Sequence, residues 1–581
     1  MPLARYVFIL LWPLVADVSL AADGAELIPR WARTGQFRFA RWDGGPLETA
    51  KAILSGWPYF VTPDPEVIYA TTNWYEPRTI DLLERAHMNW IWVTWSNGFS
   101  NETERWQQNL LQSYMKECQR RGIRVSAYLS TANIFWEDMF EQVPESKNWL
   151  LKRNGQPVPY GAGDYQKVGR VTRYMADLSH KGWQDFVLAR ALAAVSAGAD
   201  GLMFDNNFDS REQLEQFKSR VLTEARKRNP HILVNSNYHE GMYIAARYEN
   251  AITTEDGKEP GIFRLAAREE DSRLSEDGKK HPDRGVDPGI SRSGSSGKAM
   301  WSAKNEEYSV GVRDGQLVLN VGLLRSLWAV SQGWRPITVE YGARHIGDRF
   351  NNMYSVAHLK LALAESHAFH ASLETYQEAK TLRDLYFNEK NALEHWQALG
   401  QYNAFFQKHA ALYASPQSLA CIAVVIGSRD SDIAFLNRLA ARNVMYDVIY
   451  VADATTSQLA KYSVVIAAPS IPQPRPEWKR LEKISDENLI DLSLIRTHAP
   501  DTVIVNVHRQ AETSRTLVHL LNYSTSPIQG VEIAVKGKFK EARLFSPDLG
   551  TETRTLQTKP EGEATRVQAP RLEVYDLIVL E

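Results

Sequence analysis

The sequence predicts an α/β protein: a (β/α)8 barrel, then a smaller flavodoxin-like α/β domain, then a C-terminal antiparallel β-sandwich. With 581 residues, the chain is long enough for several domains. Short apolar runs alternate with amphipathic helix patterns over 78–414, which is typical of repeated βα units. Short stretches of alternating apolar and polar residues fill 501–581 and indicate antiparallel strands.

The first 21 residues have the pattern of an export signal. Arg5 supplies the positive charge, residues 6–16 form an apolar run, and small residues stand at Ser19 and Ala21. The pattern predicts cleavage after Ala21 and a secreted or periplasmic protein; the alternative is a buried N-terminal helix. No later segment reaches the roughly 18 apolar residues of a spanning helix, so we expect no membrane anchor.

The barrel is assigned to 22–414. Its eight strands are expected at 89–95, 123–129, 172–177, 201–205, 232–236, 251–255, 337–341 and 369–373. Repeated βα units form either an open sheet or a closed barrel, and eight strands favour the barrel. Residues 258–315 are rich in Gly, Ser and charged residues and are expected to be an inserted loop, either a lid or disordered.

Two further units are expected after the barrel. In 415–500, apolar runs at 419–426, 446–451 and 463–468 predict parallel strands, with a helix over 431–442. This unit lacks a Gly-rich phosphate-binding loop. Residues 501–581 are assigned to the C-terminal β domain.

Polar and aromatic residues collect where the predicted barrel strands end. The carboxyl ends of barrel strands meet at one face, which carries the chemistry in such folds. Asp205 ends the fourth strand and Glu255 ends the sixth. The residues expected to bind substrate are Trp95, Tyr128, Asp177, Asn206, Asn235, Asn237, Tyr238 and Glu340 near strand ends, with Trp74 and Trp136 in neighbouring segments.

Two carboxylates in a cleft lined by aromatic rings are typical of enzymes that cleave glycosidic bonds. One stays ionised as the nucleophile, and the other holds a proton for the leaving oxygen. We therefore assign Asp205 as nucleophile and Glu255 as general acid/base. Three alternatives stay open: Asp205 caps a helix, Glu255 only precedes the turn at Asp256, or Glu340 is the partner of Asp205.

Composition excludes several other classes. A net charge of −2 gives no reason to expect nucleic acid as a partner. No Cys and His spacing suggests zinc, so neither a metal nor a cofactor is expected. The 17 Trp and 24 Tyr suit a carbohydrate cleft, because aromatic rings pack on sugar faces. The expectation is an exported glycoside hydrolase acting on an oligo- or polysaccharide. The alternatives are a carbohydrate-binding protein on a degenerate barrel and a structural protein.

Four segments carry a resemblance to known proteins: 89–96, 123–130, 199–207 and 570–581. On these the chain resembles bacterial glycoside hydrolase-like proteins with a barrel, a glutaminase-like middle domain and a β tail. The β-galactosidases of glycoside hydrolase family 42 share that order, and their middle domain, called the trimerisation domain, implies a homo-oligomer.

The catalytic pattern departs from that family. Its members use glutamates after strands four and seven, whereas Asp205 ends strand four here. An aspartate at that position is similar to the α-galactosidase and dextranase families, so β-galactosidase activity is not carried over. The middle domain resembles a class I glutaminase fold, but Cys421 stands at the start of its strand, so amidotransferase activity is not expected.

Overall fold

The computed structural model describes most of the chain. The described residues are 28–33, 37–55, 65–160, 167–168, 171–205, 211–237, 249–263, 308–312, 315–342, 355–376, 379–427, 430–472, 475–476, 478–479, 494–524, 526–549 and 553–581. The predicted export signal therefore lies outside the described residues.

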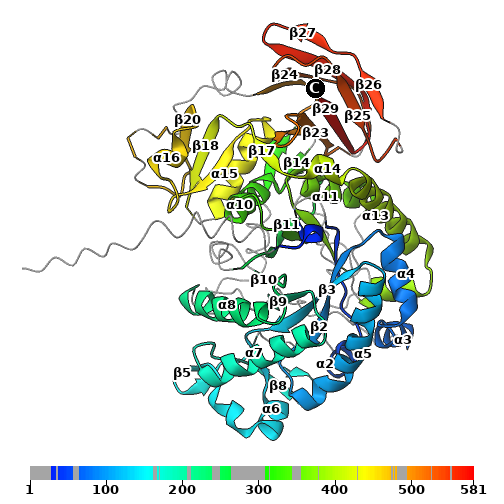
Figure 1. Ribbon diagram of the computed structural model, residues 1–581, viewed down its shortest axis with the longest axis vertical. Coiled ribbons are helices and arrows are strands. Elements are labelled where there is room, and N and C mark those ends of the chain that lie inside the picture. Colours follow the sequence, from blue (N-terminus) through cyan, green and yellow to red (C-terminus); the bar gives the residue numbers. More distant parts are fainter. Residues whose placement is uncertain are drawn as a thin grey trace, which may run out of the picture.

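Eight parallel strands form one sheet in the order β10-β9-β3-β2-β1-β16-β15-β11. They are β1 (Phe39–Arg41), β2 (Trp90–Ser96), β3 (Arg124–Ser130), β9 (Gly201–Asp205), β10 (Leu233–Ser236), β11 (Ile252–Lys258), β15 (Ile337–Gly342) and β16 (Ser372–Tyr376). A single parallel bridge between Asn237 and Thr253 joins the two end strands. The sheet is therefore a nearly closed barrel (Figure 1).

Helices cover the outside of the barrel (Figure 1). They are α4 (Pro77–Arg85), α5 (Asn101–Arg120), α7 (Lys181–Ser196), α8 (Arg211–Arg226), α10 (Val321–Ser331), α11 (Val356–Ala368), α12 (Ala379–Tyr386) and α13 (Lys390–Lys408), with α2 (Pro46–Ser55) and α3 (Pro65–Thr72) before α4. Local signals set their ends: the Ser100 hydroxyl accepts from the Thr103 N–H at the start of α5, and Gly122 follows its end at a φ of 82°.

Two separate apolar layers follow from the alternation of side chains along each strand. Ile91, Val93 and Trp95 of β2 belong to the large core between sheet and helices. Trp90 and Trp92 belong to a smaller core inside the barrel, with the other interior residues Phe39, Tyr128, Met203 and Leu233. The segment around η1 (Arg30–Ala32) fills this interior too, through Ile28, Ala32 and Phe37.

Two of the predicted barrel strands need correction. The segment predicted at 172–177 forms β8 (Val171–Met175), which pairs antiparallel with β4 (Asn133–Phe135) and β7 (Lys167–Val168) outside the barrel. The first barrel strand is instead β1, which the sequence reading missed. The prediction counted β8 as a barrel strand and omitted β1, so the two errors cancel. Asp205 therefore still ends the fourth strand around the barrel. The eighth strand begins at Ser372, three residues later than expected.

Shorter elements surround the β3-to-α7 connection and the insertion. The connection holds α6 (Trp136–Gln142), η2 (Pro144–Asn148), β5 (Lys152–Arg153) and β6 (Gln156–Pro157). The insertion begins and ends in an antiparallel sheet of β12 (Gly261–Phe263), β14 (Gly315–Val318) and β13 (Ser309–Val312). Residues 264–307 of the insertion lie outside the described residues, so its role as a lid remains a prediction.

Beyond α14 (Ala410–Tyr413), the middle unit holds a three-stranded parallel sheet in the order β19-β18-β20. Its elements are β18 (Ile422–Ile426), α15 (Asp430–Ala441), β19 (Asp447–Tyr450), α16 (Thr456–Leu459) and β20 (Val464–Ala467). β17 (Pro416–Ser418) comes before these strands in sequence but pairs with β22 (Val503–Gln510) of the tail.

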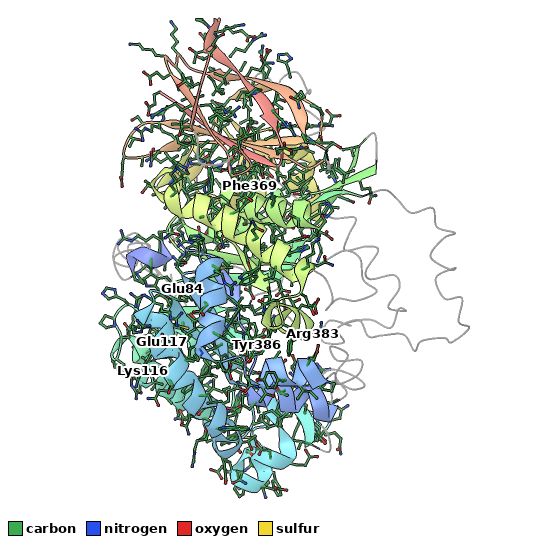
Figure 2. All side chains as sticks on the ribbon, turned by 90° about the vertical axis from the view of Figure 1, so that its right-hand side faces the viewer. Glu84, Lys116, Glu117, Phe369, Arg383 and Tyr386 are labelled. Atoms are coloured by element: carbon green, nitrogen blue, oxygen red, sulfur yellow. The ribbon has the colours of Figure 1, made fainter. Side chains whose placement is uncertain are left out.

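The tail consists of two antiparallel sheets that share one apolar core. Their remaining strands are β21 (Ile495–His498), β22 (Val503–Gln510), β23 (Thr516–Asn522), β24 (Ile528–Lys536), β25 (Ala542–Phe545), β26 (Arg554–Leu556), β27 (Lys559–Glu561), β28 (Ala564–Leu572) and β29 (Tyr575–Leu580). Figure 2 shows the tail above the barrel, with Phe369 close to the level where they meet. Among the described helices, none combines the length and apolar character needed to cross a bilayer.

Candidate active site

Asp205 lies at the carboxyl end of β9, on the interior face of the barrel. Alternation along the strand places Met203 in the interior core, while Leu202 and Phe204 pack toward the helices. The Tyr128 hydroxyl donates to Oδ2 of Asp205 at 2.8 Å, and Nδ2 of Asn237 donates to Oδ1 at 3.1 Å. Both carboxylate oxygens thus accept a hydrogen bond, which fixes the orientation of the carboxylate.

Asn237 bridges the two predicted catalytic carboxylates. The same Nδ2 that donates to Asp205 also donates to Oε1 of Glu255 at 2.7 Å. Two acceptors at 3.1 and 2.7 Å from one nitrogen are separated by no more than about 6 Å. Carboxyl groups about 5–5.5 Å apart are typical of retaining glycosidases, whereas inverting enzymes have wider separations. The structure therefore brings Asp205 and Glu255 together across the end of the barrel.

An aromatic stack lies beneath Asp205. The rings of Trp92 and Tyr128 are 4.7 Å apart and 12° from parallel. Burial, followed by the negative charge of Asp205, raises the pKa of Tyr128 well above its usual value, so its hydroxyl keeps its proton. This stack joins strands β2 and β3 and holds the hydroxyl donor toward Asp205.

Arg41 ends the short strand β1 and organises the opposite side of the barrel. Its Nε donates to Asp43 at 2.8 Å, its Nη1 lies 3.4 Å from Oε2 of Glu340, and its guanidinium carbon is 4.7 Å from the Trp92 ring centroid. Thr94 donates to the other oxygen of Asp43 at 2.8 Å. Glu340, the alternative partner of Asp205, therefore pairs with a cation, whereas Glu255 shares a donor with Asp205.

Glu374 of β16 lies deeper than Arg41. It is paired in register with Phe39, two residues before Arg41 along β1. Its side chain is buried, and Nε1 of Trp92 donates to its Oε1 at 3.3 Å. Burial and then the negative charge of Glu340 raise its pKa well above the usual value for a glutamate, with a further contribution from Glu255.

Each barrel strand, or the residue that follows it, contributes one side chain to this cluster of contacts. In order around the barrel they are Arg41, Trp92, Tyr128, Asp205, Asn237, Glu255, Glu340 and Glu374. Of these eight, the sequence reading named Tyr128, Asp205, Asn237, Glu255 and Glu340.

Two of the expected aromatic residues are placed differently from the prediction. Trp95 is 4% exposed and points into the layer between sheet and helices, opposite in alternation to Trp92. Trp74 is fully buried, with its ring 4.4 Å from that of Trp42. These placements correct the expectation that either ring is open to stack on a sugar.

Asp177 does not follow a barrel strand, which corrects its expected position. It comes after β8, and its Oδ1 accepts from the backbone N–H and the hydroxyl of Ser179 at 2.9 and 2.6 Å. This is a local turn ahead of α7, of the kind that aspartate commonly forms.

The structure describes only some of the remaining predicted residues. Asn235 is buried in the barrel below Asn237 and donates to the Thr253 hydroxyl. Asn206 and Tyr238 lie outside the described residues. Trp136 begins α6, and its side chain is likewise outside the described part of the structure.

Three members of the cluster were missed: Arg41, Trp92 and Glu374. β1 has only three residues, too few for a recognisable alternation, although Phe37 and Phe39 already share one face. Glu374 directly follows the segment predicted as the eighth strand, so a strand extended by one residue would have included it. Within the described part of the chain, no group of three or more His, Cys, Asp and Glu side chains is arranged to hold a metal ion.

Comparisons with known proteins agree on the fold. No protein-family model and no curated sequence matches the chain. Alpha-L-fucosidase isoenzyme 2 from Paenibacillus thiaminolyticus is similar in structure, with a TM-score of 0.59, 11% identity, and coverage of 94% of this chain and 99% of that one. An Anoxybacillus alpha-amylase follows with a TM-score of 0.50, 8% identity, and coverage of 94% and 98%. At such identities the likeness shows a shared fold built around a barrel.

Proposed function

We propose that this protein is an exported glycoside hydrolase that cleaves an oligo- or polysaccharide by a retaining mechanism. The observation that carries the proposal is the amide of Asn237, which donates to both Asp205 and Glu255. Structural neighbours named as an alpha-L-fucosidase and an alpha-amylase support a carbohydrate substrate. Export is supported by the sequence of residues 1–21 alone.

In the first step, an oxygen of Asp205 attacks the anomeric carbon while the bond to the leaving oxygen breaks. Glu255 gives its proton to that oxygen, and the sugar becomes an ester of Asp205. In the second step, Glu255 takes a proton from water, whose oxygen attacks the same carbon and releases Asp205. Tyr128 and Asn237 hold the Asp205 carboxylate in place and stabilise its charge in the free enzyme.

The test is hydrolysis of a panel of aryl glycosides and polysaccharides by the wild type and by Asp205→Asn. We expect the substitution to lower kcat by about 10³-fold or more with no loss of thermal stability, because it removes the nucleophile and keeps the shape. Full activity in the variant would contradict the proposal. Sugar binding without turnover in the wild type would instead identify a carbohydrate-binding protein.

A second pair of variants separates the two candidate acids. Glu255→Gln should lose about 10²–10⁴-fold on glycosides with poor leaving groups and far less on dinitrophenyl glycosides, which depart without a proton. Glu340→Gln is the matched comparison, since Arg41 rather than Asn237 holds this carboxylate. If Glu340→Gln alone shows that dependence on the leaving group, then Glu340 is the acid.

The domain limits and the oligomer also remain proposals. We propose a barrel over 22–414, a glutaminase-like middle domain over 415–500 and a β-sandwich over 501–581. We further propose that the middle domain supports homo-oligomer contacts, and light scattering of the purified protein would measure them.

A further inference from the structure

One carboxyl oxygen of Glu374 has no hydrogen-bond partner among the described residues. Glu374 is 4% exposed. Its Oε1 accepts from Nε1 of Trp92 at 3.3 Å, whereas its Oε2 is buried and has no hydrogen-bond partner among the described residues. Buried polar atoms in native proteins nearly always have a partner, so an oxygen in this condition requires an explanation.

The surroundings of Glu374 disfavour a charged carboxylate. Arg41, whose charge acts on Glu374, is also bonded to Asp43 and Glu340. Burial and then the negative charge of Glu340 raise the pKa of Glu374, the positive charge of Arg41 acts against them, and the net shift is well above the usual value. This direction favours the protonated carboxyl over the carboxylate.

The hydrogen bond from Trp92 tells the two oxygens apart. In a neutral carboxyl, the oxygen that accepts from an N–H is the carbonyl, which assigns that role to Oε1. The unpartnered Oε2 then carries the proton and needs an acceptor. The same Trp92 ring stacks on Tyr128, which donates to Asp205, so this donor belongs to the layer directly beneath the proposed nucleophile.

We propose that Glu374 is a specificity-determining residue whose O–H donates a hydrogen bond to an oxygen of the sugar bound between Asp205 and Glu255. This inference rests on the proposed function for the position of the sugar. It implies an uncharged glycosyl unit with an unsubstituted hydroxyl or its ring oxygen on that side. A uronate or sulfate there would face the carboxylate of Glu340 and is expected to be rejected.

The test compares two variants of Glu374. Glu374→Gln keeps both functions, because its amide oxygen can accept from Trp92 and its NH₂ group can donate to the sugar. Glu374→Leu removes the donor at similar size. We expect kcat/KM on the best aryl glycoside to stay within about threefold for Gln and to fall at least about tenfold for Leu. Rescue by Gln is an outcome that a purely structural role for the carboxylate charge would not give.

The matched control is Asp576→Asn in β29 of the tail. Asp576 is also a fully buried carboxyl, but it lies in the tail, outside the barrel. We expect this variant to leave kcat/KM unchanged. A loss equal to that of Glu374→Leu would mean that any buried carboxyl change disturbs the protein, and it would overturn the specific role.

A second measurement works without turnover and even if Glu374→Leu fails to fold. Infrared difference spectra of the wild type are recorded on adding neutral monosaccharides (glucose, galactose, mannose, fucose), with Glu374→Gln as reference. We expect at least one sugar to shift the C=O band of a protonated carboxyl that Gln lacks. An ionised Glu374 at neutral pH, or no shift with any sugar that binds, would overturn the inference.

These outcomes separate the two proposals. If no glycoside is hydrolysed but a monosaccharide shifts the Glu374 band, the binding role stands and the hydrolase proposal fails. If glycosides are hydrolysed and Glu374→Leu works as well as wild type, the hydrolase proposal stands and the role of Glu374 fails.

Discussion

The side chains around Asp205 form a chain of contacts in which each residue fixes the next. Asn237 sets the separation of the two carboxylates, and Tyr128 fixes one oxygen of Asp205 from below. A hydrogen bond to a charged group is worth about 1.5–3 kcal/mol, so these two donors matter more than their number suggests. Their removal should therefore slow the reaction.

The Tyr128→Phe variant tests whether the hydroxyl of Tyr128 contributes to the reaction. The variant keeps the ring stack with Trp92 and removes the hydroxyl donor to Asp205. We expect kcat to fall by about 10- to 100-fold, because the lost bond holds the charged nucleophile, and the melting temperature to fall as well, because a buried hydrogen bond contributes to stability. Steady-state kinetics and a melting curve measure the two effects.

Tyr114→Phe is the control for that prediction. Its hydroxyl is also buried and bonded, to Trp42 and Thr79, but on the helix side of the sheet. It should lower the melting temperature and leave kcat unchanged. The reverse pattern, with Tyr128→Phe destabilised and fully active, would contradict the role of Tyr128.

At the scale of elements, a buried ion pair positions the segment between β2 and α5. Arg190 of α7 lies 2.9 Å from Oε2 of Glu104, and both side chains are at most 5% exposed. Oε1 of Glu104 accepts from the backbone N–H groups of Asn97 and Phe99 at 2.8 and 3.1 Å. This pair therefore shapes the chain where it leaves a barrel strand.

Removing one partner of the Arg190–Glu104 pair should strongly lower the stability of the protein. Arg190→Met leaves Glu104 buried without its cation, and we expect a loss of about 3–5 kcal/mol in the free energy of unfolding. The double variant with Glu104→Met should recover a large part of that loss, because no charge stays buried. Urea unfolding of the two single variants and the double variant measures the coupling, and simple additivity would count against this account.

The lengths of the strands also explain which of them could be predicted from the sequence. β2, β3 and β9 carry five to seven residues, enough to show a buried apolar run. β1 has three residues, and its place in the sheet depends on pairing with both β2 and β16. β8 has an ordinary strand pattern of five residues, so nothing local distinguishes it from a barrel strand.

At the scale of the whole molecule, the tail packs on the barrel helices through buried histidines. Figure 1 shows α11, α13 and α14 between the tail sheets and the barrel. His508 and His519 of the tail have ring centroids 4.9 Å apart, and His370, just after α11, lies 5.0 Å from His508. Burial lowers the pKa of His508 and of His367 to about 3.

These histidines predict a loss of stability in acid. The folded protein keeps them neutral, while the unfolded chain takes up protons below its ordinary pKa near 6.5, so unfolding binds protons. Stability should therefore rise with pH between about 3 and 6.5, by up to roughly 1.4 kcal/mol per pH unit for each histidine. Melting temperatures between pH 4 and 7 measure the slope.

His508→Leu is the variant for that prediction. Neither ring nitrogen of His508 has a hydrogen-bond partner among the described residues, so Leu removes a titrating group without removing a bond. We expect a flatter dependence on pH with unchanged stability at pH 7. An unaltered slope would show that carboxylates, not this cluster, control the acid response.

The sequence by itself determined the α/β class, the strand that ends in Asp205 and the strand that carries Glu255, because these features depend on the short-range pattern of apolar and polar residues. It also named Asn237 and Tyr128 as polar groups near the same edge. Only the tertiary structure decided which faces of the strands point inward, and so turned Trp92 toward the site and Trp95 away from it. Barrel closure likewise brought β1 beside β16 and placed Arg41 near Glu340. Arg41 and Glu340 are some 300 residues apart in the chain. A local sequence pattern cannot predict a contact between segments so far apart.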